Sequence, residues 1–315
     1  MKMLLRSMLY FPATSVRMIS KAATLPVDAT ILDLEDAVSL EDKETARILA
    51  KDYVALIKRR GISTFVRVNS VASGLAADDL RAIAVRGLDG VMLAKTETRT
   101  DIVTVTKILR LVEKRSRLAS ASIRLIPLIE SAKGVENSFQ IASASKRVAG
   151  VAFGAGDYCR DLGRDVNLIS KEEDELLYAR SRIVNASRAA ETQAIDTPFL
   201  GSLVDREAFL REVKLAARLG FRGKQCVHPS QVEPINESFS PTHEEVDRAS
   251  RIVKAFKQAQ RSGQAAISFE GKMVDIMTYR QALDLIASNR VIDEKRHKMT
   301  RLQPYVPLSE IFTKT

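Results

Sequence analysis

The sequence has no tryptophan, and aromatic residues make up only 5% of its 315 residues. Proteins that bind single-stranded nucleic acid stack the bases on exposed aromatic side chains, so this class is not favoured. The formal net charge is nevertheless +10, without any block of five or six like charges. A diffuse basic excess of this kind favours a small ligand that carries phosphate groups. We therefore expect an anionic small molecule as the partner, and no nucleic acid.

Cysteine and long apolar runs are also scarce. The two cysteines, Cys159 and Cys226, cannot form a disulfide framework, and neither has the neighbours of a zinc site. The longest apolar runs, such as Ile123 to Ile129, fall short of the roughly 20 residues that span a bilayer. Met1 to Tyr10 lacks the apolar region and cleavage site of a signal peptide. We expect a cytoplasmic globular protein with no membrane partner.

Eight short apolar runs recur along the chain, each bounded by Gly, Pro, Asp or Asn, a pattern typical of buried parallel strands. The predicted strands are Leu4 to Phe11, Ala29 to Leu34, Thr64 to Val68, Gly90 to Ala94, Arg124 to Ile129, Val148 to Gly154, Ala194 to Phe199 and Lys224 to Val227. Predicted helices lie between them, at Leu40 to Arg59, Ala77 to Arg86, Thr100 to Arg117, Glu172 to Ala190 and Asp205 to Leu219. This alternation over about 230 residues predicts an α/β fold of the (β/α)8 TIM-barrel type, which usually needs about 250, rather than an open sheet.

The C-terminal part departs from this alternation. Thr242 to Ser262 is predicted to form a long amphipathic helix, Gly263 to Gly271 ends it, and Met273 to Asn289 predicts a further short helix. We therefore divide the chain into a catalytic barrel domain of residues 1–240 and a C-terminal helix, lid and tail of residues 241–315. The second part is expected to act as a lid or as an arm toward a neighbouring subunit.

Catalytic groups of such barrels lie at the C-terminal ends of the strands. The polar residues at those positions are Arg67, Lys95, Glu130, Asp157, Asp196 and His228. Glu130 and Asp157 end neighbouring predicted strands, so their carboxylates can converge on one cation. Mg²⁺ is the natural occupant, because it combines few carboxylates with water and substrate oxygens. Ion pairs with Lys133 or Arg160 would explain the same two acids without a metal.

Acidic residues also gather after the second predicted strand, in Asp33-Leu34-Glu35-Asp36. Asp33 and Glu35 should point to one side, with Asp36 in the loop, although such a run can also cap the next helix. Arg67 lies on a strand that alternates inward and outward, and an inward arginine must pair with an anion. That anion is either a substrate carboxylate or oxyanion, or the side chain of Glu35 or Glu130 in a structural salt bridge.

Two further motifs are weaker. Gly154-Ala155-Gly156 resembles a phosphate-binding loop, but Cys159 replaces the third glycine of a dinucleotide fingerprint, so we exclude a nicotinamide site. His228 and Pro229 follow the eighth predicted strand, and His228 is expected to contact ligand or pack rather than act as a base.

A set of short motifs runs in order along nearly the whole chain, and their combination is specific although no single motif is. They are Arg6-Ser7, Phe11-Pro12, Leu32-Asp33-Leu34-Glu35-Asp36-Ala37-Val38, Val66-Arg67-Val68-Asn69, Ile129-Glu130-Ser131-Ala132, Ala155-Gly156-Asp157, Tyr178-Ala179-Arg180-Ser181-Arg182, Ile195-Asp196-Thr197-Pro198, Gly223-Lys224, His228-Pro229 and Gly271-Lys272-Met273-Val274-Asp275. Together they resemble the citrate lyase β-subunit and malyl-CoA lyase family of carbon–carbon lyases, which are related to HpcH/HpaI aldolases.

The resemblance implies a homotrimer or hexamer that acts on thioesters of coenzyme A or of an acyl-carrier protein. It implies Mg²⁺ held by Glu130 and Asp157, and Arg67 on the keto acid or the reacting carbonyl. It also implies that the C-terminal segment closes over a neighbouring subunit's site and contributes the acid Asp275.

The phosphates of the carrier would account for part of the basic excess through Arg17 and Lys21, although both could equally be solvated helix residues. The expected catalytic residues are Arg67, Asp275, Glu35 and Asp36, the expected substrate contacts are Arg67, Arg17, Lys21, Lys95, Gly156 and His228, and the expected metal ligands are Glu130 and Asp157. Four positions depart from the family pattern without removing a proposed ligand, and they leave the substrate and the lid geometry open: Ala13, Ala94, Gly156 and Met277.

The function implied is Mg²⁺-dependent cleavage of a malyl-, citramalyl- or citryl-type 3-hydroxyacyl thioester into a keto acid and an acyl thioester. Hydrolysis of the same thioesters is one alternative, since a water held by the metal or by Glu35 could attack the carbonyl. An aldolase acting on free keto acids would need no carrier pocket. A noncatalytic RNA-binding role rests only on the net charge, and predicts binding that weakens steeply with salt.

Overall fold

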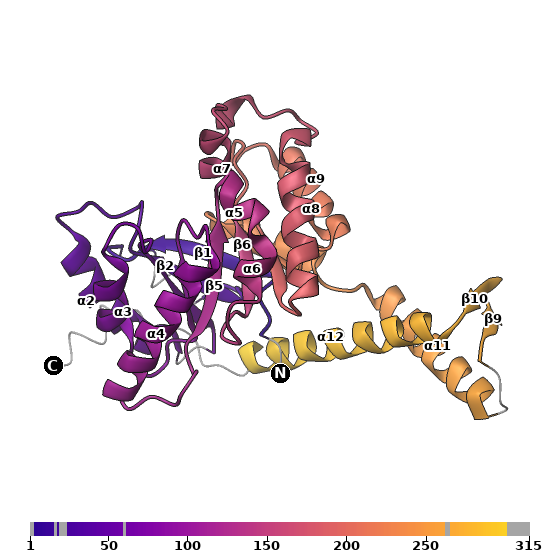
Figure 1. The fold of residues 1–315 in the computed structure, drawn as a ribbon. Coiled ribbons are helices and arrows are strands. Elements are labelled where there is room, and N and C mark those ends of the chain that lie inside the picture. Colours follow the sequence, from indigo (N-terminus) through magenta and orange to yellow (C-terminus); the bar gives the residue numbers. More distant parts are fainter. Residues whose placement is uncertain (1–2, 16–17, 19–23, 59–60, 262–264, 301–315) are drawn as a thin grey trace. The chain divides into compact units, whose positions relative to one another are not determined.

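A computed structural model describes residues 3–15, 18, 24–58, 61–261 and 265–300. Within these residues, eight parallel strands close into a barrel in the order of the sequence (Figure 1). They are β1 (Ser7–Pro12), β2 (Ala29–Asp33), β3 (Ser63–Val68), β4 (Gly90–Leu93), β5 (Arg124–Ile129), β6 (Gly150–Phe153), β7 (Gln193–Asp196) and β8 (Gly223–Cys226). The predicted (β/α)8 barrel is confirmed.

Alternation along the strands decides which side chains reach the mouth of the barrel. The interior is filled by apolar side chains of successive strands, among them Met8, Ile31, Phe65 and Leu128. Successive side chains of a strand point to opposite faces, so the residue two positions further on points inward again. The inward residues at the C-terminal mouth are therefore Tyr10, Asp33, Arg67 and Glu130.

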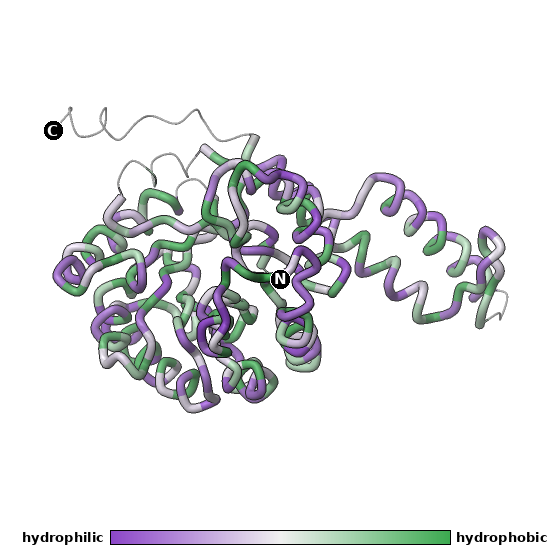
Figure 2. Tube along the Cα trace, turned by 90° about the horizontal axis from the view of Figure 1, so that it is seen from above, coloured by the Kyte–Doolittle hydropathy of each residue, from purple (hydrophilic) through white to green (hydrophobic). Residues whose placement is uncertain are grey.

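Helices connect the strands around the outside of the barrel (Figure 1). They are α2 (Lys43–Lys58), α3 (Ala76–Ile83), α4 (Arg99–Arg115), α5 (Ala132–Glu136), α6 (Ser138–Ala142), α7 (Ala155–Asp161), α8 (Asp174–Ala189), α9 (Arg206–Leu219) and α10 (Val232–Ser238), with short 3₁₀ helices η1 (Val166–Leu168) and η2 (Pro229–Gln231). Hydrophilic and hydrophobic residues interchange along them, as expected of helices with one buried face (Figure 2).

Asp196 was expected at the mouth, and this expectation is wrong. Ile195 belongs to the interior cluster, so Asp196 faces outward, toward the surrounding helices. There it pairs with Arg180 at 3.0 Å and with Lys224 at 2.7 Å, and all three side chains are fully buried. Glu212 pairs with the same two cations. The cluster joins α8 and α9 to the last two strands and has a structural role.

The chain divides into two compact units, and the second begins at Glu237. This unit contains α11 (His243–Arg261), the antiparallel hairpin of β9 (Ile267–Phe269) and β10 (Lys272–Val274), and α12 (Ile276–Thr300). Its core is a separate apolar cluster that includes Phe256, whose ring stacks on that of Tyr279 with centroids 4.9 Å apart. No helix in the part of the chain that the structure describes is both long and apolar enough to cross a membrane.

The second unit differs from the sequence prediction in two respects. The segment from Gly263 to Gly271, predicted only to end a helix, contains β9, and its turn residues Glu270 and Gly271 both have positive φ, 50° and 74°. Two such residues match the twist of a tight hairpin. The final helix was predicted from Met273 to Asn289, whereas α12 begins at Ile276 and continues to Thr300.

Candidate active site

The register of β2 and β3 brings Asp33 and Arg67 side by side at the mouth. The Arg67 guanidinium donates from Nε to Asp33 Oδ1 and from Nη2 to Asp33 Oδ2, both at 2.6 Å. Asp33 also accepts from the backbone N–H groups of Glu35 at 2.9 Å and Ala37 at 3.1 Å. Asp33 is only 2% exposed. This bidentate pair fixes the plane of the guanidinium.

The other contacts of Arg67 are with the Tyr10 ring and with two acids of the loop after β2. Its guanidinium carbon lies 5.2 Å from the centroid of the Tyr10 ring, a cation–π arrangement. The Tyr10 hydroxyl donates to Gln225 Oε1 at 2.8 Å, which holds the ring. Arg67 Nη1 faces Glu35 at 3.2 Å and Asp36 at 3.5 Å. The alternative of a salt bridge to Glu35 is thus present, but the principal partner is Asp33.

Lys95 links the acidic loop after β2 to the ends of β4, β5 and β6. Its ammonium group contacts Glu35, lies 3.2 Å from Asp36 Oδ1, and lies 3.8 Å from Asp157 Oδ2. Its backbone N–H donates to Glu130 Oε1 at 2.6 Å. Lys95 has a φ of 48°, in the left-handed region that side chains other than glycine rarely adopt. Strain of this kind is common at functional sites, where the surrounding contacts enforce it.

The pKa values of the two neighbouring acids of this loop shift in opposite directions. Burial, together with the hydrogen bond to Asp36, raises the pKa of Glu35. Burial acts in the same direction on Asp36, but the hydrogen bond with Glu35 and the charges of Arg67 and Lys95 lower its pKa. Glu35 therefore takes up a proton at a higher pH than an ordinary glutamate does, and Asp36 at a lower pH than an ordinary aspartate does.

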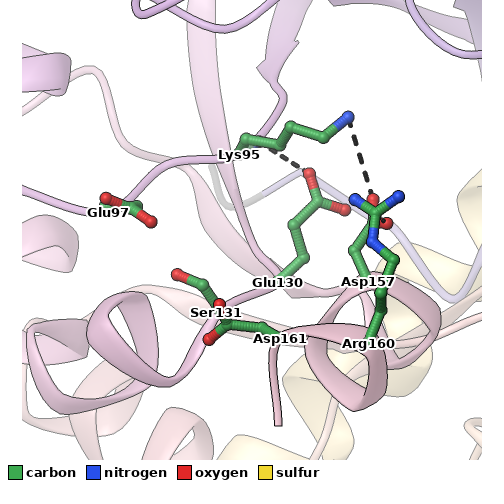
Figure 3. A pocket seen from close by; sticks show the side chains of 7 residues that line it. All are labelled: Lys95, Glu97, Glu130, Ser131, Asp157, Arg160 and Asp161. Atoms are coloured by element: carbon green, nitrogen blue, oxygen red, sulfur yellow. Dashed lines mark hydrogen bonds and ion pairs between the residues drawn. The ribbon is translucent and has the colours of Figure 1, made fainter. Parts of the chain in front are cut away.

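A pocket of about 190 Å³ opens beside this loop (Figure 3). It is lined by Lys95, Glu97, Glu130, Ser131, Asp157, Arg160 and Asp161. Glu130 and Asp157 extend from neighbouring elements toward Lys95 in this pocket (Figure 3). Asp157 also pairs with the exposed Arg160 at 2.8 Å, which is the predicted non-metal alternative for that residue. Lys133 instead pairs with Glu97, at 2.9 Å.

The environment of Glu130 fits a bound cation. Burial raises the pKa of Glu130 to about 8, and the charge of Asp157 adds to this, although the Lys95 N–H and the charge of Arg67 oppose it. Among the described residues, no lysine ammonium or arginine guanidinium nitrogen forms an ion pair with the Glu130 carboxylate within 4.0 Å. A buried carboxylate without a cationic partner gains most from a metal ion.

The donor set favours Mg²⁺. The described residues contain no group of three or more His, Cys, Asp or Glu side chains that could hold a metal ion by themselves. Mg²⁺ does not need such a group, because it usually takes one or two carboxylates and keeps water or substrate oxygens for its other positions. Glu130 and Asp157 are two carboxylates that line the same pocket, so this pair fits such a site.

The glycines before Asp157 have separate roles, rather than forming one phosphate loop. A Cβ on Gly154 would lie 2.7 Å from Glu130 Oε2, whereas a Cβ on Gly156 would have no neighbour within 4 Å. Gly154 therefore gives space to Glu130. Gly156 leaves open space next to Asp157.

The remaining predicted site residues are His228, Asp275, Arg17 and Lys21. The His228 ring bonds to the Ser230 hydroxyl at 2.7 Å beside η2. Asp275 lies in the second unit, where its carboxylate accepts from the Thr278 N–H at 2.9 Å before α12. The hydrogen bonds from the backbone and side chain of Thr278 lower the pKa of Asp275. Arg17 and Lys21 lie outside the described residues.

The sequence analysis missed Tyr10 altogether, and it did not predict that Asp33 is the principal partner of Arg67. Both could have been found from strand alternation, because each lies two positions after a residue of the apolar interior, Met8 or Ile31.

Comparison with known proteins assigns the family. Residues 6–229 match the family described as HpcH/HpaI aldolase/citrate lyase. The citrate lyase subunit beta of Escherichia coli (strain K12) is 40% identical over 271 residues, which cover 86% of this chain and 88% of that protein. The mitochondrial citramalyl-CoA lyase of Homo sapiens is 32% identical over 300 residues, or 92% of this chain and 87% of that protein.

A solved structure supports the same conclusion. The crystal structure of CitE from Mycobacterium tuberculosis in complex with magnesium, acetoacetate and coenzyme A has 30% sequence identity and a TM-score of 0.72, and the match covers 90% of this chain and 98% of that one. The family match, the sequence identities and the structural similarity agree. The chain belongs to the HpcH/HpaI aldolase/citrate lyase family.

Proposed function

We propose that this protein is a Mg²⁺-dependent carbon–carbon lyase that cleaves or forms a 3-hydroxyacyl thioester of the malyl, citramalyl or citryl type. The products of cleavage are a keto acid and an acyl thioester. Relatives named citrate lyase subunit beta and citramalyl-CoA lyase support this reaction class. The observation that carries it is the buried Glu130, next to Asp157 and in the electrostatic field of the fixed guanidinium of Arg67.

Cleavage moves the electron pair of one carbon–carbon bond. The substrate hydroxyl loses its proton and becomes the carbonyl of the keto acid, while the bond electrons pass to the acyl fragment as a thioester enolate. The enolate is then protonated on carbon. The developing oxyanions carry the energetic difficulty, and a fixed positive donor next to one is worth about 3 to 4 kcal/mol. Arg67 is such a donor, because Asp33 and Tyr10 hold its plane.

Glu130 and Asp157 would hold Mg²⁺, which when bound supplies Lewis-acid polarisation of the keto-acid oxygens. The other residues prepare the site. The Lys95 N–H orients the Glu130 carboxylate, and the Lys95 ammonium compensates the charge of Glu35 and Asp36. Gly156 leaves room for the substrate beside Asp157. For His228 we propose a contact with the substrate and no role as a base.

Asp275 would move the proton to or from the acyl carbon. We assign it to the site of a neighbouring subunit in a homotrimer or hexamer, with the second unit as the lid. The hydrogen bonds from Thr278 lower the pKa of Asp275. Enclosure by the lid would remove water from this carboxylate, and that desolvation would raise its pKa. The carrier is coenzyme A or an acyl-carrier protein, whose phosphates would be met by Arg17 and Lys21.

One assay tests this function. The protein with Mg²⁺ is incubated with malyl, methylmalyl, citramalyl and citryl thioesters, and released keto acid and free thiol are measured in parallel. A lyase releases keto acid without thiol, a thioesterase releases thiol without keto acid, and excess chelator stops the reaction. Free thiol as the only product, or turnover that persists in chelator, would contradict the proposal. Turnover of free hydroxy acids without any thioester would identify an aldolase instead.

A further inference from the structure

Lys43, the first residue of α2, is a buried ammonium beneath the acidic loop of the site. It is 7% exposed. Its Nζ donates to the carbonyl oxygens of Leu34 at 2.7 Å and Glu35 at 2.8 Å, and to Asn69 Oδ1 at 3.0 Å. An ammonium group has three N–H donors, so these three acceptors satisfy it completely.

Asn69 extends the network to α3. Its Nδ2 donates to the Leu34 carbonyl at 3.0 Å and to Asp79 Oδ2 at 2.7 Å, and its backbone N–H donates to the same Asp79 oxygen at 2.9 Å. Both Asn69 and Asp79 are buried. A partly satisfied polar network would be costly at this depth, whereas a satisfied one specifies a single arrangement.

The two carbonyls that Lys43 binds lie just past the end of β2. Strand pairing there ends with Leu34, whose N–H donates to the Arg67 carbonyl. Without Lys43 the Leu34 carbonyl would keep only its hydrogen bond from Asn69 Nδ2, and the Glu35 carbonyl only the one from the Val38 N–H at 3.2 Å. Each peptide plane would therefore lose its charged donor. Those planes set the direction in which the Glu35 side chain leaves the backbone, toward Arg67 Nη1 and the Lys95 ammonium.

We infer that Lys43 is a positioning residue for the reaction, which acts by fixing the backbone of Leu34 and Glu35 and thereby the acidic loop against Arg67 and Lys95. The inference rests on the proposed function, in which these groups surround the reacting atoms. Misplacement of a catalytic group by about 1 Å can lower the rate about 100-fold. Lys43 touches neither substrate nor metal in this scheme.

The test compares Lys43→Gln with Arg147→Gln, since both replace a buried cation by a neutral amide. Arg147 lies before β6, at the opposite end of the barrel, where it binds Glu113 through two nitrogens. Lys43→Gln is expected to lower kcat about 100-fold with KM within about threefold, while Arg147→Gln loses thermal stability but keeps kcat. An unchanged kcat in Lys43→Gln, or an equal loss in Arg147→Gln, would overturn the inference.

A double-variant cycle separates positioning from general damage. If Lys43 acts through Glu35, Lys43→Gln should cost kcat no more than about threefold in a Glu35→Gln background. If the double variant instead loses kcat by the product of the two single-variant losses, Lys43 does not act through Glu35. Asn69→Ala is expected to give the same pattern with a smaller loss, and it decides the question if Lys43→Gln does not fold.

Hydrogen exchange provides a readout that does not depend on catalysis. The amides of residues 35–37 should exchange faster in Lys43→Gln and at the wild-type rate in Arg147→Gln. If these amides exchange faster in Lys43→Gln but the wild-type protein cleaves no thioester, the proposed function is contradicted. The anchoring of the loop by Lys43 is supported in that case. Unchanged protection of residues 35–37 would overturn the anchoring itself.

Discussion

The Arg67 guanidinium is bound by the Asp33 carboxylate and lies over the Tyr10 ring. Both contacts require a planar group, so the planarity of the side chain matters as much as its charge. Lysine supplies a point charge without a planar fork, so it cannot keep both Asp33 bonds and still present a nitrogen at the mouth. We expect Arg67→Lys to lower kcat about 100-fold. Steady-state kinetics of the keto-acid release assay measures this, and activity within about threefold of wild type would return Arg67 to a structural salt bridge.

Glu130→Gln and Asp157→Asn should each abolish lyase activity and weaken Mg²⁺ binding by about 100-fold or more, because a neutral amide is a poor ligand for a hard cation. Calorimetric titration with Mg²⁺ measures the affinity. Without metal, Glu130→Gln should melt no lower than wild type, because it removes a buried carboxylate with a raised pKa. A large drop in melting temperature would point to a structural role for Glu130.

The raised pKa of Glu130 also predicts how Mg²⁺ binding depends on pH. Because burial raises this pKa to about 8, the metal-free protein carries a proton on Glu130 at neutral pH, and Mg²⁺ must displace it. The apparent affinity should rise up to about tenfold per pH unit as the pH increases toward 8, and then level off. Titrations between pH 6.5 and 9 in buffers of different ionisation enthalpy test this. A flat profile without proton release would show that Glu130 is ionised before the metal binds.

At the scale of an element, the start of α7 determines whether Glu130 and Asp157 can converge. Gly154 packs against the Glu130 carboxylate, while Gly156, two residues later, faces open space. Gly154 has ordinary extended backbone, with φ −117°, so alanine there is excluded by contact and not by conformation.

Gly154→Ala should therefore displace Glu130 and weaken Mg²⁺ binding about tenfold or more, whereas the matched Gly156→Ala should leave Mg²⁺ affinity within about threefold. Calorimetry on both variants, with circular dichroism to verify folding, is the measurement. Equal affinities in the two variants would mean that Glu130 can move aside or does not bind the metal.

The second unit shows why short elements are hard to predict. The hairpin of β9 and β10 has three-residue strands, and its Glu270-Gly271 turn lacks the Asn-Gly or Asp-Gly pair that marks such turns most strongly. Ile267–Phe269 does alternate between apolar and polar residues, as a strand would. Three residues are too few, however, for periodicity to distinguish a strand from a loop.

At the scale of the whole molecule, the proposed shared site predicts complementation between inactive chains. Asp275→Asn and Arg67→Ala should each be nearly inactive alone. Mixed oligomers formed by unfolding and reassembly should regain part of the activity, because some sites then combine an intact barrel with an intact lid from another chain. Mass spectrometry verifies that mixed oligomers form. If they do and no activity returns, Asp275 acts within its own subunit or is not catalytic.

The sequence by itself determined the barrel and the chemical character of its mouth. Strand-length apolar runs alternate with helical segments along the chain. Because this pattern depends only on residues close together in the sequence, it predicted all eight strands within a few residues of their observed bounds. The polar residues that follow those runs had to lie at one end of the barrel, since parallel strands all end there. Arg67, Lys95, Glu130 and Asp157 were found in this way.

Only the tertiary structure decided which of these residues meet. The pairing of Asp33 with Arg67 depends on the register of two strands, and a shift of one residue would turn either side chain to the other face. The same parity turns Asp196 away from the mouth, toward Arg180 and Lys224. Such contacts join residues far apart in the chain, and they follow from how the barrel closes, which no local pattern encodes.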